Sequence, residues 1–172
     1  MTDHVSIELA AESELVHFVA ASLQESVYEE IPAYSPRRAE DIAVQFATFR
    51  EGRLPGNQLH WAIRDRDTDE CLGSLQANFK PHQNIEIGYR VRSVHQGKGI
   101  ATTALRQLLD ELLSSMPNHQ LLALVHPDNV ASLRVLVKAD FIAIEPQHEA
   151  SCGIPDHRRC FQYCPPATSD AA

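Results

Sequence analysis

The chain has few of the features that mark a metal-binding or disulfide-linked protein. Its 172 residues include only four cysteines, and no two of them form a Cys-x-x-Cys pair. Cys152, Cys160 and Cys164 lie near His157, but structural zinc sites use closely spaced cysteine pairs. We therefore expect reduced, partly buried thiols and no metal site.

Long apolar runs and an excess of positive charge are also missing. No apolar stretch approaches the roughly 20 residues that span a membrane, and residues 1–15 lack the basic start and apolar block of a signal peptide. Acidic residues outnumber basic ones by 23 to 15, which gives a formal net charge of -8. Nucleic-acid binding needs a basic surface. We therefore predict a cytoplasmic protein that binds neither nucleic acid nor a membrane.

The rest of the composition is typical of one globular domain. Hydrophobic residues make up 44% of the chain and charged residues 22%, which indicates a packed core rather than disorder. A length of 172 residues suits a single domain. The sequence shows no internal repeat and no linker that would divide it.

Apolar periodicity in the first part of the chain predicts a strand, two helices and three more strands. Weak alternation predicts a strand over 5–9, and apolar residues at helical spacing predict helices over 12–23 and 37–50. Glycine, proline and asparagine within 52–57 end the second helix. Period-two patterns with short turns then predict an antiparallel meander, with strands at 58–66, 71–79 and 85–92.

The second part of the chain predicts alternating helices and strands. Apolar residues at helical spacing predict a long helix over 98–115, which Pro117 ends. A strand, a helix and two closing strands follow, at 121–125, 130–137, 141–144 and 158–163. This order predicts an α/β fold, with helices flanking a mixed, mostly antiparallel central sheet.

A candidate phosphate site lies where the strand over 85–92 leads into the long helix. The first turn of a helix has unpaired N–H groups at the positive end of its dipole, so it attracts anions. Gly97 and Gly99 allow backbone amides to approach a phosphate without an intervening Cβ. Lys98 adds a positive charge, and Arg92 lies just before the loop. We therefore predict that residues 96–101 bind a phosphate group.

Three phosphate-binding motifs can be compared with this loop. A P-loop is absent, because glycine rather than serine or threonine follows Lys98. A GxGxxG motif is only half present, because its third position is Thr102. The pattern [Q/R]-x-x-G-x-[G/A] is complete, at Gln96, Gly99 and Ala101. On these residues the sequence resembles the GNAT superfamily of N-acetyltransferases.

The order of elements fits this superfamily over about residues 5–163, including an Asn-x-x-Ser sequence at the start of the later helix. The segments WAIRD, CLGSLQA, IEIGYRV and QGKGIATTAL resemble the branch that acetylates the N-termini of ribosomal proteins, which also contains enzymes that act on antibiotics and small amines. Two departures are Asp140-Phe141, where the family commonly has Gly-Phe, and the lack of an acidic residue near Thr103-Ala104. The resemblance implies one acetyltransferase domain over 1–164 and a disordered tail over 165–172.

The resemblance also implies the co-substrate and the residues that hold it. The pyrophosphate of acetyl-CoA would lie on the loop and first helical turn, at Gln96, Gly97, Lys98, Gly99, Ile100 and Ala101. A bulge at the end of the preceding strand would present a backbone amide of Val91 or Arg92 to the thioester oxygen. Asn129 would hold the pantetheine arm, although an asparagine here is equally suited to a simple helix cap.

Acetyl transfer to an amine needs a proton acceptor for the amine and support for the departing thiolate. Glu86 is the candidate base, with a solvent-facing strand carboxylate as the alternative. By resemblance, Ser132 is the candidate donor to the thiolate, with an ordinary first-turn serine as the alternative. His95 and His126 are weaker candidates for proton relay. The superfamily further implies that the acceptor pocket includes Tyr28 and Tyr34.

These residues predict direct transfer of an acetyl group from acetyl-CoA to a primary amine in a ternary complex. The acceptor is a protein N-terminus or a small molecule such as an amino acid, a polyamine or an antibiotic, and the acidic composition favours a cationic one. A non-catalytic acyl-CoA-binding regulatory domain and a dinucleotide-binding module are the alternatives. The sequence is compatible with a homodimer.

Overall fold

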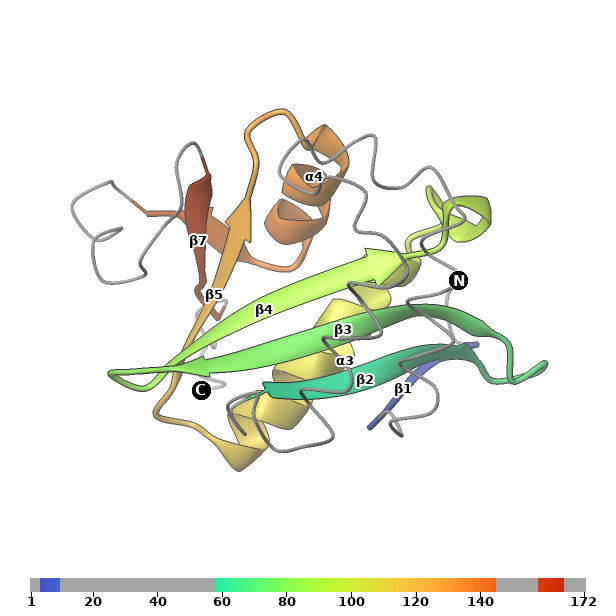
Figure 1. Cartoon of the computed structure of the whole chain (residues 1–172), viewed down its shortest axis with the longest axis horizontal. Helices are drawn as coiled ribbons and strands as arrows, with labels where there is room; N and C mark the ends of the chain where they lie inside the picture. Colours follow the sequence, from blue (N-terminus) through green and yellow to red (C-terminus); the bar gives the residue numbers. More distant parts are fainter. Residues whose placement is uncertain (1–3, 10–57, 145–157, 166–172) are drawn as a thin grey trace, which may run out of the picture.

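The computed structural model describes residues 4–9, 58–144 and 158–165. In these ranges the chain forms a seven-stranded sheet with the order β1-β2-β3-β4-β5-β7-β6 (Figure 1). The predicted helices over 12–23 and 37–50 lie outside the described residues, as do Tyr28, Tyr34 and tail residues 166–172.

The observed elements follow the predicted order, and their ends agree with the predicted ends to within two residues. The strands are β1 (Val5–Leu9), β2 (Gln58–Asp65), β3 (Cys71–Lys80), β4 (Asn84–Val91), β5 (Gln120–Val125), β6 (Phe141–Ala143) and β7 (Arg159–Tyr163). The helices are α3 (Ile100–Ser115), α4 (Val130–Lys138) and the short 3-10 helix η2 (Ser93–His95). None of the described helices is long and apolar enough to cross a membrane.

Strand pairing confirms the predicted mixed, mostly antiparallel sheet. Strands β1 to β4 pair antiparallel in sequence order, as do β5 with β7 and β6 with β7. The pair β4–β5 is parallel, and α3 connects its two strands. A parallel pair needs such a crossover, because the chain must return to the same end of the sheet.

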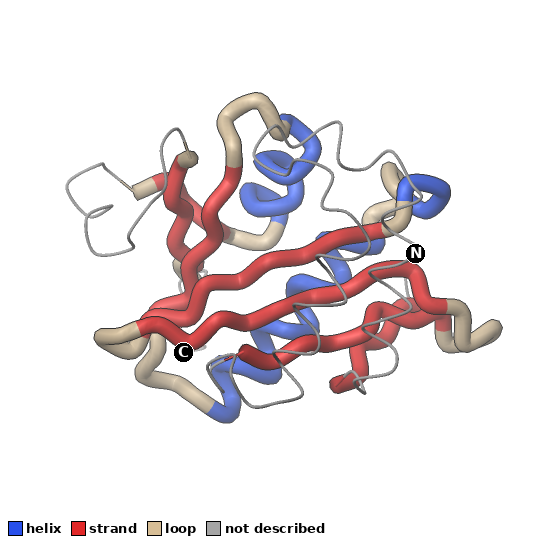
Figure 2. The backbone as a smooth tube through the Cα atoms, in the orientation of Figure 1, coloured by secondary structure: helices blue, strands red, loops and turns tan. Residues whose placement is uncertain are grey.

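Strands β4 and β5 pair over only part of their length. Their register includes Asn84 with Gln120, Ile85 with Leu121 and Glu86 with Leu122, and no later pair joins these two described strands. Beyond Glu86 the strands diverge in a V, which Figure 2 shows clearly. Strand β4 stays paired with β3 as far as Val91, so the gap opens on one edge of β4 alone.

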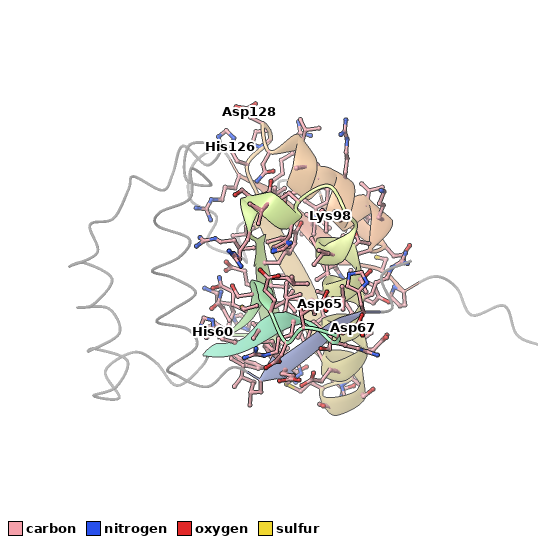
Figure 3. All side chains as sticks on the ribbon, turned by 90° about the vertical axis from the view of Figure 1, so that its right-hand side faces the viewer. His60, Asp65, Asp67, Lys98, His126 and Asp128 are labelled. Carbon is pink, nitrogen blue, oxygen red and sulfur yellow. The ribbon has the colours of Figure 1, made fainter. Side chains whose placement is uncertain are left out.

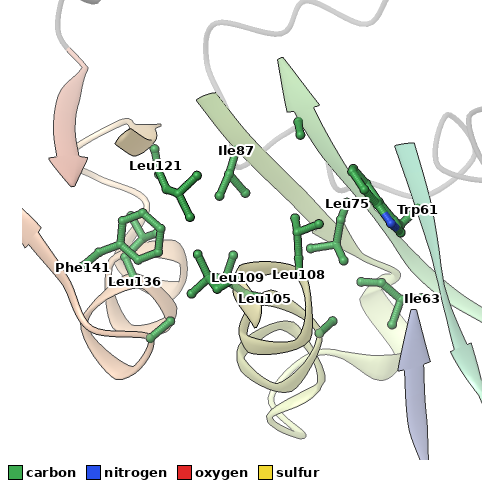
Figure 4. Close-up of a cluster of buried hydrophobic side chains, with 14 of the residues drawn as sticks. Trp61, Ile63, Leu75, Ile87, Leu105, Leu108, Leu109, Leu121, Leu136 and Phe141 are labelled. Carbon is green, nitrogen blue, oxygen red and sulfur yellow. The ribbon is translucent and has the colours of Figure 1, made fainter. Parts of the chain in front are cut away.

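The helix α3 covers one face of the sheet with an apolar stripe. Its buried leucines Leu105, Leu108 and Leu109 recur at helical spacing and lie beside Leu75 and Ile87 of the sheet (Figure 4). The side view in Figure 3 shows α4, in orange, on the same side of the sheet as α3. Burying these side chains secures the start of α3 against the end of β4.

The sequence predicted a bulge at the end of β4, and this prediction is wrong for the pairing of β4 with β3. The β3–β4 register runs without a shift from Lys80 with Asn84 to Gly73 with Val91. A Cβ added to Gly73 would lie 2.2 Å from the carbonyl oxygen of Arg90. The missing side chain therefore allows the two strands to continue in close, regular pairing where a larger residue would force them apart.

Candidate active site

The gap between β4, β5 and α4 contains a cleft with two adjoining lobes. The loop lobe, of about 380 Å³, is lined by the end of β4, the loop after η2, the first turn of α3 and one face of α4. The strand lobe, of about 180 Å³, is lined by β3, β4, β5 and the start of α4. Four residues line both lobes, namely Tyr89, Arg90, Asn129 and Ser132.

The loop lobe contains the N-terminus of α3, where the N-cap residue is Gly99 and makes no side-chain capping hydrogen bond. Gly97 and Gly99 have φ angles of 75° and 81°, in the left-handed region that glycine adopts without a steric penalty. Gly99 is the residue before the helix, so α3 begins at Ile100 rather than at the predicted Lys98. The first N–H groups of a helix have no acceptor within it. A Cβ added to Gly97 would meet no atom within 4 Å, so the loop presents an open face to an anion.

The side chain of Gln96 connects this loop to the end of β4. Its Nε2 donates a hydrogen bond to the carbonyl oxygen of Val91, at 3.1 Å. The backbone N–H of His95 donates to the carbonyl of Arg92, at 2.9 Å, which adds a second connection. The glutamine of the sequence motif therefore holds the loop in place as well as lining the lobe.

Most of the predicted phosphate-binding residues line the loop lobe, but Lys98 and Arg92 do not. The ammonium group of Lys98 donates to the carbonyl of Val94 at 3.1 Å. The guanidinium of Arg92 binds the carboxylate of Glu70 at 2.9 Å, on the other side of the loop. The predicted basic side chains are therefore engaged elsewhere, while the backbone of their loop faces the cleft.

Besides Arg90 of β4, positive charge in the loop lobe comes from α4, at Arg134 and Lys138. These two residues lie one helical turn apart on the same face of α4. The sequence carried this signal in the i, i+4 spacing of the two basic residues. Only the fold shows that this face of α4 is turned toward the loop after β4.

The backbone of β4 offers a donor to the gap at Val91 rather than at Arg92. The N–H of Arg92 donates to Leu72 in β3, at 2.9 Å. Because hydrogen-bonding direction alternates along a strand, the N–H groups of Tyr89 and Val91 point toward the β5 side. The bond from Gln120 N–H to the carbonyl of Gln83, at 2.8 Å, agrees with this alternation. Of the two predicted amides, Val91 therefore has the suitable direction.

The N-terminus of α4 is capped. The side-chain oxygen of Asn129 accepts a hydrogen bond from the backbone N–H of Ser132, at 2.9 Å. Asn129 therefore acts as the helix cap that the sequence allowed, and the cap uses only its side-chain amide oxygen. The same side chain also has an NH₂ group. Asn129 lines both lobes, so it is placed where a ligand could contact that group.

The strand lobe contains Glu86, the predicted base. Its carboxylate lies 3.2 Å from the ammonium group of Lys80, and the side chain is 24% exposed. Arg90, Arg158 and His126 line the same lobe. The charged side chains that the structure describes here are thus mainly basic, the opposite sign to the whole chain.

Tyr89 is another residue of the cleft that the sequence analysis did not identify as a site residue. Its phenol oxygen lies 2.7 Å from the hydroxyl of Ser132 and 3.0 Å from the carbonyl oxygen of the same residue. Burial raises the pKa of Tyr89 to about 12, and the hydrogen bond to Ser132 opposes this only in part. Period-two alternation grouped Tyr89 with Ile85, Ile87 and Val91 as an apolar face, which conceals its polar end.

The two candidate relay histidines lie at opposite ends of the cleft. His95 lines the loop lobe, and its Nε2 is 3.2 Å from the carboxylate of Glu70. His126 lines the strand lobe, and its Nδ1 is 3.5 Å from Asp128. In the part of the chain that the structure describes, no group of three or more His, Cys, Asp or Glu side chains could hold a metal ion.

Comparisons of the sequence with known families agree with this geometry. Residues 5–142 match the model of the family described as the acetyltransferase (GNAT) domain. The chain is 32% identical over 90 residues to an uncharacterized N-acetyltransferase, p20, of Bacillus licheniformis, a match that covers 51% of each protein. The chain spans about half the length of the curated relatives it matches.

Solved structures share the fold across nearly the whole chain. A ribosomal-protein-S5-alanine acetyltransferase from Vibrio fischeri matches with a TM-score of 0.68 and 19% identity, covering 93% of this chain and 92% of that one. A spermidine N-acetyltransferase chimera from Vibrio cholerae and hSSAT matches with a TM-score of 0.71 and 14% identity, covering 94% and 95%. At these identities the likeness concerns the fold, and the predicted fold class is confirmed.

Proposed function

This chain belongs to the acetyltransferase (GNAT) domain family, and on that premise we propose that it transfers an acetyl group from acetyl-CoA to a primary amine in a ternary complex. One observation carries the proposal. The uncapped N-terminus of α3, formed by Gly97 and Gly99, opens into the same cleft as Glu86 and Ser132. The candidate anion site and the acid–base groups thus lie in adjoining lobes that share four lining residues.

The loop lobe fits the phosphate-containing part of acetyl-CoA. The amides that begin α3 would bind the pyrophosphate, and Arg134 and Lys138 would supply positive charge. The NH₂ group of Asn129 would bind the pantetheine arm where the two lobes meet. The acetyl group would then lie near Val91 and Ser132, with the amine entering from the strand lobe.

The transfer needs no covalent attachment to the protein. The amine nitrogen forms a bond to the thioester carbon, the carbonyl electrons move to oxygen, and the N–H of Val91 stabilises that charge. Glu86 accepts the amine proton, directly or through a water molecule. The C=O bond then re-forms as the C–S bond breaks, and the electron pair of the C–S bond stays on sulfur, to which the Ser132 hydroxyl donates a hydrogen bond.

Ligand-dependent melting tests the co-substrate. A ligand that binds only the folded state stabilises it by about 2.7 kcal/mol at a hundredfold excess over its dissociation constant. We expect acetyl-CoA to raise the melting temperature and NAD and ATP to leave it unchanged. An equal shift with NAD would support the dinucleotide-binding alternative, and no shift with acetyl-CoA would reject the co-substrate.

An acceptor panel with detection of free CoA tests the reaction, and mass spectrometry identifies the product. The panel includes an N-terminal peptide, spermidine, free amino acids and an aminoglycoside antibiotic, so that each acceptor class is represented. Binding of acetyl-CoA without CoA release from any amine would favour the non-catalytic acyl-CoA-binding alternative.

The substitution Glu86→Gln tests the base. It keeps the shape of the side chain and removes its proton affinity, so kcat should fall by about 10²- to 10⁴-fold with acetyl-CoA affinity nearly unchanged. The deficit should shrink at high pH, where more of the amine is already neutral. Glu8→Gln, which changes an exposed carboxylate on β1, is the matched control. Wild-type kcat in Glu86→Gln across the pH range would assign Glu86 a purely structural role.

A further inference from the structure

We infer that Tyr89 is a positioning residue for Ser132, and that it directs the Ser132 hydroxyl toward the sulfur atom of the bound thioester. This inference rests on the proposed function, because it concerns the same cleft and co-substrate. It assigns a task to a side chain on β4 that reaches the first turn of α4 across the gap.

The position of the pair in the cleft is the first argument. Tyr89 lies three residues beyond Glu86, where the pairing of β4 with β5 ends, so its ring stands beside the opening gap. Tyr89 and Ser132 both line the two lobes. Their hydrogen bond therefore lies at the junction where the phosphate-binding part of the cleft meets the part that contains Glu86.

The hydrogen-bond partners of Ser132 are the second argument. Its N–H donates to Asn129, and its carbonyl and hydroxyl oxygens are 3.0 Å and 2.7 Å from the phenol oxygen of Tyr89. All three polar atoms of Ser132 are thus held by two neighbours. A serine hydroxyl has three staggered positions, and a contact of 2.7 Å with Tyr89 favours one of them.

Counting hydrogens gives two arrangements of the same heavy atoms. A phenol has one hydrogen, and a carbonyl oxygen only accepts. If Tyr89 donates to the carbonyl of Ser132, the serine hydroxyl donates back to Tyr89 and offers the cleft only lone pairs. If Tyr89 donates to the Ser132 hydroxyl, the serine hydrogen is released to point into the cleft. A sulfur atom that gains negative charge favours the second arrangement.

The neutral state of the phenol is the third argument. Burial raises the pKa of Tyr89 to about 12, far above the value of about 8.5 for an ordinary thiol. Tyr89 is therefore a poor source of a proton for a thiolate. Because its phenol stays protonated, it remains a hydrogen-bond donor. By donating to Ser132 it strengthens the bond that Ser132 donates onward.

The test compares the binding of CoA with that of desulfo-CoA, which lacks only the sulfur atom, by calorimetry at a pH of about 9.5, above the usual thiol pKa. We expect the wild-type protein to prefer CoA. In Tyr89→Phe this preference should fall by about 3- to 10-fold, the range expected for one hydrogen bond, while desulfo-CoA affinity stays within twofold. Ser132→Ala should lose the same preference, and the double variant should lose no more than either single variant.

Tyr163→Phe is the matched control, because Tyr163 lies on β7, packs against Phe141 and lines neither lobe. Melting temperatures of all variants separate loss of packing from loss of the sulfur contact. A Tyr89→Phe protein that keeps the wild-type preference overturns the inference, as does a wild-type protein that binds both ligands equally. If the wild-type protein binds neither ligand, the proposed function itself fails.

Discussion

Two helices begin at the same cleft in different ways. The helix α3 follows Gly99 in a left-handed conformation and has no side-chain cap. The helix α4 follows Asn129, whose side-chain oxygen accepts the N–H of Ser132 at 2.9 Å. Both helices have the same kind of N-terminus, but only α4 has an N-cap residue whose side chain occupies a first-turn amide.

The difference shows how a cap and an anion site compete. A capping side chain occupies the same N–H groups that a phosphate would bind. An asparagine at the start of α4 therefore stabilises that helix and reduces its capacity for an anion. A glycine at the start of α3 has no side chain to cap the helix, so this N-terminus keeps the features that favour an anion. α3 has 16 residues and α4 only nine, and the longer helix is better able to do without a cap.

The largest expected effect is from closing the open helix end. Gly99→Val places a branched side chain at a φ of 81°, which strains the backbone and fills the space before α3. Hydrogen bonds to charged groups are worth about 1.5–3 kcal/mol each, so losing two of them should weaken acetyl-CoA binding by roughly a hundredfold or more. Calorimetry measures the affinity.

Gly99→Asn separates backbone strain from the loss of open amides, because asparagine tolerates positive φ better than valine but can also cap a helix, and it should remain folded and still bind acetyl-CoA more weakly. Circular dichroism and the melting temperature show whether each variant is folded. A folded Gly99→Val protein with wild-type affinity for acetyl-CoA would place the anion site elsewhere.

A smaller effect on acetyl-CoA binding is expected from removing the cap of α4. Two substitutions distinguish the capping role of Asn129 from its proposed contact with the pantetheine arm. Asn129→Ala removes the cap and should lower the free energy of unfolding by about 1 kcal/mol. Asn129→Asp keeps an oxygen acceptor for Ser132 and removes the NH₂ donor, so stability should be nearly unchanged. Both variants should bind acetyl-CoA about fivefold more weakly if the NH₂ group binds the pantetheine arm. Wild-type affinity in Asn129→Asp would show that Asn129 is only a cap.

The smallest effect is expected from Lys98, which lies between the two glycines of the open end. Its ammonium group is exposed and donates to the carbonyl of Val94, and it does not line the loop lobe. Lys98→Ala should therefore change acetyl-CoA affinity by less than about threefold, because an exposed charge contributes little.

Arg134→Ala is the comparison for Lys98→Ala, because Arg134 does line the loop lobe. It should weaken binding more than Lys98→Ala, and the difference should shrink as salt concentration rises. A larger loss in Lys98→Ala than in Arg134→Ala would contradict the arrangement described here.

The sequence predicted the position of the loop before α3 from local signals, and the structure has this loop between η2 and α3, lining the cleft. Glycines at 97 and 99, a helix pattern after them and Gln96 before them are enough to indicate an anion site. The start of α3 was predicted at Lys98 rather than at Ile100, because periodicity does not report the φ angle of Gly99. Asn129 could be read from the sequence as a cap or as a ligand contact, and the structure shows the cap directly.

Other features of the cleft depend on contacts between distant parts of the chain. Tyr89 and Ser132 are 43 positions apart, and no local pattern indicates that their oxygens are 2.7 Å apart. Arg92 was predicted from its place beside the loop, but its guanidinium turns to Glu70 across the β3–β4 pair. Strand alternation gives the face of a side chain, whereas the partner on that face comes from the packing of another element.

By itself, the sequence determined the order of the described strands and helices, the family resemblance and the position of the glycine-containing loop before α3. Each of these follows from turn residues, periodicity or a short motif, which act within a few neighbouring positions. The tertiary structure decided where β4 and β5 separate, which amide of β4 faces the gap, and that Tyr89 meets Ser132 there. These depend on sheet register and on the seating of α4, and both are set by the burial of side chains that are distant in the sequence.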